Sequence, residues 1–203
     1  MLAWLLPAWV AATLPPAAAQ PASAEADAAL AARAAQLLNF VRDRMAGCAA
    51  PPTEARAAWP AAQPVAWSHA TPAVLEPAGV AAGPAPARPS LRWQPRLAVA
   101  AERHTEAMAR LDFFDHVDPA GHTVAQRVRD TGYAWRVVGE TLASGQASIE
   151  EALRDWLASP SHCAALLDGR FTEFGLARVP RPQPGAPGAA LWTLVLGRPV
   201  GAR

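Results

Sequence analysis

Apolar residues recur every three or four positions in four segments of the chain, and this spacing predicts four helices. The predicted helices cover residues 24–45, 96–111, 123–131 and 148–158. The stripe of the first helix runs from Leu30 to Met45 and ends just before Gly47, a residue that commonly terminates helices. Pro95 precedes the second helix in a position that suits a first turn.

Capping signals support the two later helices. Thr123 and Gln126 form one capping box, and Ser148 and Glu151 form another, each just ahead of the predicted helical turns. The last helix is expected to stop before Pro160, because a proline does not continue a helix.

Three extended segments follow or separate these helices, at residues 133–144, 171–179 and 191–196. A Pro/Gly-rich loop, residues 180–190, divides the last two. Helices gathered early and strands gathered late predict an α+β fold rather than an alternating, doubly wound α/β fold.

Two regions lie outside this pattern. Residues 1–19 form an apolar run that ends in an A-x-A site at Ala17 and Ala19, which is typical of a signal peptide, although the run begins without Arg or Lys. A membrane anchor is the alternative, but the run is short and broken by prolines. We expect export, a soluble mature chain and a secreted or periplasmic location. Residues 49–90 are rich in Pro and Ala without periodicity, and we interpret them as an insertion in a single domain, residues 20–203.

Composition narrows the possible functions. The chain has 203 residues and a formal net charge of +1, so no charged field points to nucleic acid. All the basic residues are Arg, and the absence of Lys excludes Schiff-base chemistry and a P-loop lysine. Cys48 and Cys163 most simply form one disulfide in an oxidising compartment. The alternative is a nucleophilic Cys163 beside His162, but neighbours in sequence seldom face each other productively.

Four of the five histidines lie between residues 104 and 162. His104 falls on the apolar side of its predicted helix, where a buried, hydrogen-bonded ring is expected. His116, Glu140 and His162 lie at the edges of predicted elements, and His122 is expected to be exposed. Two imidazoles and a carboxylate suit either a borderline cation such as Zn²⁺ or acid–base chemistry near neutral pH.

Taken in order, seven segments resemble the motifs of bacterial members of the CAP superfamily (SCP-like; cysteine-rich secretory protein, antigen 5, pathogenesis-related 1). The segments that carry the resemblance are residues 91–98, 104–109, 113–116, 139–143, 156–163, 171–175 and 191–193. The resemblance implies an α-β-α sandwich in which a central antiparallel sheet lies between helical layers. It also implies a disulfide between Cys48 and Cys163.

The family cavity is built from two histidines and two acidic residues. Carried onto this chain, the resemblance assigns His116, Glu140 and His162 to it, whereas Ser159 stands where the second acidic residue is expected. His116 and His162 are then the expected metal ligands. The resemblance also assigns two supporting residues, His104 and Thr141, the latter replacing the usual Asn with a hydroxyl that can still form a hydrogen bond.

These features favour an exported, monomeric and non-catalytic binding module. Its cavity would take a divalent metal such as zinc, a lipid or sterol, another small ligand or a cell-envelope component, and no cofactor is required. Two alternatives are a structural envelope protein with a vestigial cavity and a His/Glu-dependent hydrolase, in which His116 or His162 acts as a general base oriented by Glu140. Whether the protein is an enzyme therefore stays open, with the balance against it.

Overall fold

The computed structural model describes residues 21–48 and 87–201. The expected signal peptide, residues 1–19, and residues 49–86 of the expected insertion lie outside the described residues. The described elements, in chain order, are α1 (Pro21–Arg44), β1 (Arg92–Trp93), α2 (Pro95–Leu111), α3 (Val124–Asp130), β2 (Trp135–Ser144), α4 (Ile149–Ala158), α5 (Pro160–Leu167), β3 (Glu173–Pro180) and β4 (Ala190–Pro199).

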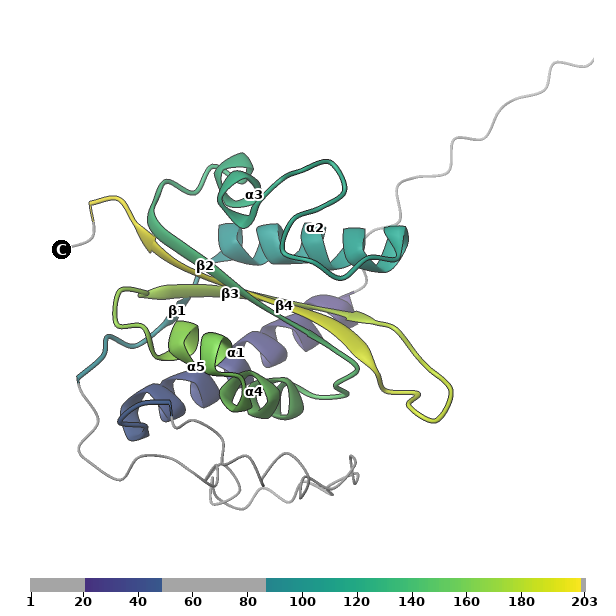
Figure 1. The fold of residues 1–203 in the computed structure, drawn as a ribbon, viewed down its shortest axis with the longest axis horizontal. Coiled ribbons are helices and arrows are strands. Elements are labelled where there is room, and N and C mark those ends of the chain that lie inside the picture. Colours follow the sequence, from purple (N-terminus) through teal and green to yellow (C-terminus); the bar gives the residue numbers. More distant parts are fainter. Residues whose placement is uncertain (1–20, 49–86, 202–203) are drawn as a thin grey trace, which may run out of the picture.

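The four strands form one sheet in the order β1-β3-β4-β2. β4 pairs antiparallel with both β2 and β3, whereas the two-residue β1 pairs parallel with β3. Helices α2 and α3 cover one face of the sheet, and α1, α4 and α5 cover the other (Figure 1). The α+β class and the α-β-α sandwich are confirmed, but the sheet is mixed at β1 rather than wholly antiparallel.

Each face of the sheet has its own apolar packing. On one face α1, α4 and α5 pack around the fully buried Trp156, Trp192 and Phe174. On the other, Leu97 of α2 packs with Tyr133 and neighbouring apolar side chains. Helix α2 lies unusually close to β3, and a glycine of that strand, Gly175, makes this approach possible, since an added Cβ would lie 2.1 Å from the backbone nitrogen of Ala98.

Most local predictions are confirmed. Thr123 and Gln126 form the complete capping box at α3, and Ser148 accepts a hydrogen bond from the Glu151 N–H at α4. Helix α5 was not predicted. Pro160, expected only as a stop signal, occupies the first turn of a new helix, where its missing N–H has no helical partner to lose.

Within the described ranges, none of the helices has the length and apolar character needed to cross a bilayer.

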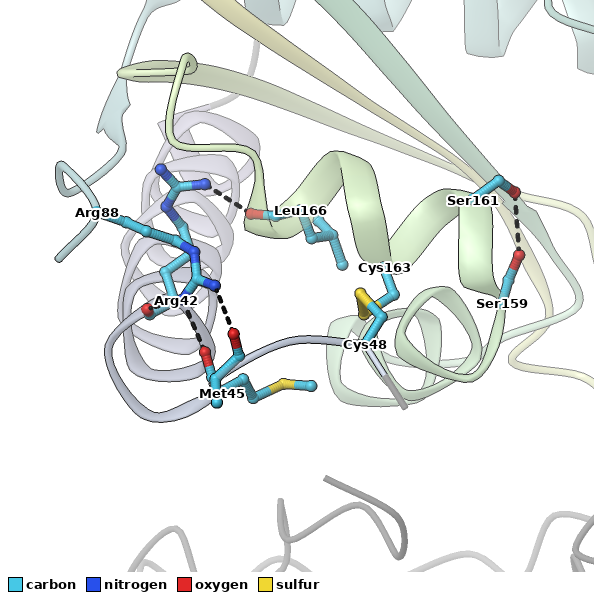
Figure 2. Close-up of a disulfide and its surroundings, with 9 residues drawn as sticks. Arg42, Met45, Cys48, Arg88, Ser159, Ser161, Cys163 and Leu166 are labelled. Atoms are coloured by element: carbon cyan, nitrogen blue, oxygen red, sulfur yellow. Dashed lines mark hydrogen bonds between the residues drawn. A yellow bond between two sulfur atoms is a disulfide. The ribbon is translucent and has the colours of Figure 1, made fainter. Parts of the chain in front are cut away.

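The end of α1 is attached to α5 by the predicted disulfide, Cys48–Cys163, which joins residues 115 apart in sequence (Figure 2). The buried guanidinium of Arg42 reinforces the attachment, donating to the Leu166 carbonyl at 2.6 Å and to the Asp168 carbonyl at 3.1 Å, both at the C-terminal end of α5. Burial, with a further contribution from the charge of nearby Arg88, lowers the pKa of Arg42 to about 10. Arg42 therefore stays charged at neutral pH and satisfies carbonyls that α5 leaves without helical partners.

Candidate functional site

The side chains of the candidate site come from both helical layers and the outer strand of the sheet. His104 lies on α2, His116 in the loop between α2 and α3, and Glu140 on β2. His162 lies on α5, and Ser159 occupies the junction between α4 and α5. The structure thus draws the predicted residues from segments that are far apart along the chain.

Glu140 is the centre of the cluster, and its side chain is only 1% exposed. The Nδ1–H of His116 donates to Glu140 Oε1 at 2.9 Å. Arg127 donates from Nη2 to Glu140 Oε2 at 2.7 Å. Both carboxylate oxygens are therefore engaged by donors of this chain.

The hydrogen bond to Glu140 fixes the orientation of the His116 ring. Because a carboxylate only accepts, Nδ1 of His116 carries the proton, and Nε2 is left available on a side chain that is 51% exposed. The same hydrogen bond raises the pKa of His116, with burial acting in the opposite direction.

Arg127 was not predicted as a site residue. Besides Glu140, its guanidinium donates from Nη1 to the carbonyls of His116, at 3.0 Å, and His122, at 2.8 Å. One buried cation therefore closes the loop of residues 116–122 onto α3 and balances the charge of Glu140. Its role depends on contacts between separate elements, and no spacing in the sequence signals them.

His104 lies on the buried side of α2, as the periodicity predicts. Its Nε2–H donates to the carbonyl of Asp115 at 2.9 Å, and the same nitrogen is 4.0 Å from Glu140 Oε1. Burial lowers the pKa of His104, and the ring is therefore neutral at pH 7. This ring supports the loop immediately before His116.

Thr141 does not behave as expected. Its side chain is fully buried, and its hydroxyl has no hydrogen-bond partner among the described residues. Successive side chains of a strand point to opposite faces, so Thr141 turns away from the face that Glu140 occupies. The hydroxyl that replaces the family's amide therefore makes no contribution to the cluster around Glu140.

The other imidazole of the predicted pair belongs to His162 on α5, where the charge of His116 still acts on it. Burial lowers the pKa of His162, and the charge of His116 lowers it further. Ser159, in the position of the missing carboxylate, lies with its hydroxyl oxygen 3.3 Å from that of Ser161 (Figure 2). His122 is exposed, as predicted, and its Nδ1 pairs with Asp118 at 3.0 Å.

These donors restrict which metal the site could take. Within the described ranges, no three His, Cys, Asp or Glu side chains form a ready-made ligand set. Imidazole nitrogens suit a borderline cation, whereas a hard cation such as Ca²⁺ needs oxygen ligands, and Glu140 is already engaged by Arg127 and His116. In this arrangement Glu140 holds the His116 ring in one orientation and is not itself free to bind a cation.

Comparison with known proteins identifies the family of this chain. Residues 81–195 match the model of the CAP family, described as the cysteine-rich secretory protein family. The match covers more than half of the chain, and the chain belongs to this family.

Two relatives from Bacillus subtilis match a smaller part. The chain is 28% identical over 83 residues to the uncharacterized protein YkwD, which is 41% of this chain and 32% of that protein. It is 28% identical over 86 residues to the uncharacterized membrane protein YlbC, or 42% of this chain and 25% of that protein. The match thus spans a third or less of either relative's length. A crystal structure of an extracellular SCP-domain protein from Bacillus anthracis is 25% identical, with a TM-score of 0.49 over 55% of this chain and 34% of that one.

Proposed function

We propose that this protein is an exported CAP-domain binding module that takes a divalent transition metal between His116 and His162. The hydrogen bond from His116 to Glu140 carries the proposal, because it fixes the ring and leaves Nε2 for a ligand. A carboxylate in this outer position orients a ligating imidazole and strengthens its basicity. His162 supplies the second nitrogen, and water fills the remaining positions.

The affinity is expected to be moderate. Ser159 provides no carboxylate, and the negative charge of Glu140 is already balanced by Arg127. A cation at this site therefore gains little from fixed negative charge and depends on the two imidazole nitrogens. Zn²⁺, which accepts nitrogen ligands readily, is the suitable probe.

The test is calorimetric titration of Zn²⁺ into the mature, oxidised protein. We expect a single site with micromolar affinity that is lost in His116→Ala and in His162→Ala. His122→Ala is the matched control, since this exposed histidine lies in the same loop and points to Asp118 instead. No Zn²⁺ binding by the unmodified protein, or equal loss in the His122 variant, would overturn the proposed site.

Export is proposed from two independent features, the leader-like residues 1–19 and the disulfide between Cys48 and Cys163. Expression of the full chain in a bacterium, followed by mass spectrometry of the fraction outside the cytoplasm, tests it. We expect a chain that begins at Gln20 and lacks free thiols. An uncleaved, reduced chain confined to the cytoplasm would contradict this part of the proposal.

A further inference from the structure

Among the described strands, β2 lies at one edge of the sheet and pairs only with β4. In an antiparallel strand, successive residues direct their backbone N–H and C=O groups alternately to the two sides. The Gly145 N–H donates to the Ala190 carbonyl at 2.9 Å, in the same register as the β2–β4 pairs. The odd-numbered residues of β2 therefore bond to β4, and Val138, Glu140 and Leu142 direct their backbone groups away from the sheet.

One of these outward groups is already occupied. The indole N–H of Trp156 donates to the Leu142 carbonyl at 2.9 Å. This contact agrees with the register and closes one end of the edge. By contrast, the backbone groups of Val138 and Glu140 make no hydrogen bond within the part of the chain that the structure describes.

The free backbone groups also face solvent. The Glu140 side chain is 1% exposed, yet the residue as a whole is only partly buried, so its exposed surface belongs to the main chain. Gly139, which has no side chain, is likewise partly buried. The open stretch is short, because a register shift lies between Trp135 and Val137 and the Trp156 contact lies beyond Glu140.

We propose that an extended peptide segment of a partner binds here by adding a short strand to β2 at Val138 and Glu140. An extended backbone offers donors and acceptors at the same spacing as these outward groups, which is the principle of recognition by strand addition. Unpaired edges otherwise invite unspecific pairing. Here His116, whose ring is hydrogen-bonded to Glu140, lies beside the open stretch and can select the side chains of the peptide.

This inference does not depend on metal binding, and its experiment is done in EDTA. A phage-displayed library of random dodecapeptides is selected on the mature, oxidised protein. Selected peptides are then measured against Val138→Pro, which removes the outward N–H without removing a bond to β4, and against Val138→Ala, the control for the lost side chain. We expect binding to weaken at least tenfold in the proline variant and to stay within threefold in the alanine variant.

A second measurement uses the unmodified protein alone, so that it remains decisive if the proline variant fails to fold. Amide hydrogen exchange by NMR should show the Val138 and Glu140 amides exchanging rapidly in the free protein and slowing at least tenfold when a selected peptide binds. N-methylation of alternate peptide residues should abolish binding. Failure to select any peptide, equal affinity for the proline variant, or unchanged exchange at both amides would overturn the proposal.

Discussion

Removing the disulfide tests how this chain is held together. Cys48 is exposed and Cys163 is fully buried, and they are 115 residues apart in sequence. We predict that Cys48→Ser lowers the free energy of unfolding substantially while leaving the native fold unchanged. Serine at an exposed position has little cost of its own, so the loss measures the covalent link.

The size of the effect follows from the length of the closed loop. For a separation of 115 residues, the chain-entropy model gives about 4.8 kcal/mol at 25 °C. The measured loss is expected at about 3 to 5 kcal/mol, because compact unfolded chains reduce the gain. The native fold should persist because Arg88 still donates to the carbonyls of Met45, at 2.7 Å, and Ala46, at 3.2 Å, and so holds the end of α1 in place.

The assay is urea denaturation followed by circular dichroism, on the oxidised protein, the reduced protein and Cys48→Ser. Relative to the oxidised protein, the reduced protein and Cys48→Ser should show the same decrease in the free energy of unfolding. Deleting residues 49–86 shortens the loop by roughly a third, and the disulfide should then be worth only about 0.4 kcal/mol less. A loss below about 1 kcal/mol in both reduced forms would refute the loop-closure argument, since the link would then not constrain the unfolded chain.

Three further predictions concern single side chains. Gly175→Ala forces a Cβ into the backbone of α2 and should cost about 3 kcal/mol by urea denaturation, whereas Gly169→Ala, which meets nothing within 4 Å, should be nearly neutral. Arg127→Met leaves the buried charge of Glu140 without its cation and should cost about 3 kcal/mol, with partial recovery in the double variant with Glu140→Gln in a thermodynamic cycle. Burial lowers the pKa of His104 in the folded protein. As the pH drops below about 6.5, the imidazole is therefore protonated in the unfolded chain before it is in the folded one, and the free energy of unfolding decreases as the pH decreases. His104→Gln should lessen that fall, and an unchanged slope between pH 7 and 5 would contradict the assignment.

The sequence predicts the elements whose signals are local. The period of α2 places Leu97, His104 and Met108 on its buried face, and all three are buried. The capping box predicted at Thr123 and Gln126 forms at the start of α3, because both residues lie within one helical turn. The family motifs then supply the order of the layers, which local signals alone do not determine.

The elements that were not predicted depend on contacts between distant segments. Strand β1 has only two residues, and its pairing with β3 joins positions about eighty apart in sequence. The side chain of Asn39 on α1 holds its entry, both donating to the Leu91 carbonyl and accepting from the Leu91 N–H. Only Ser159 separates α4 from α5, and Pro160, which the sequence marks as the end of one helix, occupies the first turn of the next.

In the candidate site, too, the sequence indicates single residues but not the charge interactions between distant segments. Motifs indicate His116, Glu140 and His162, and by the resemblance Ser159 stands where a second carboxylate is expected. They do not show that Arg127 has taken Oε2 of the remaining carboxylate at 2.7 Å. A buried carboxylate needs a compensating positive charge or hydrogen bonds, and this chain supplies both from its own side chains. Glu140 is thus committed to holding His116 and the loop of residues 116–122, and the binding that we propose depends on His116 and His162 for a metal and on the open edge of β2 for a peptide.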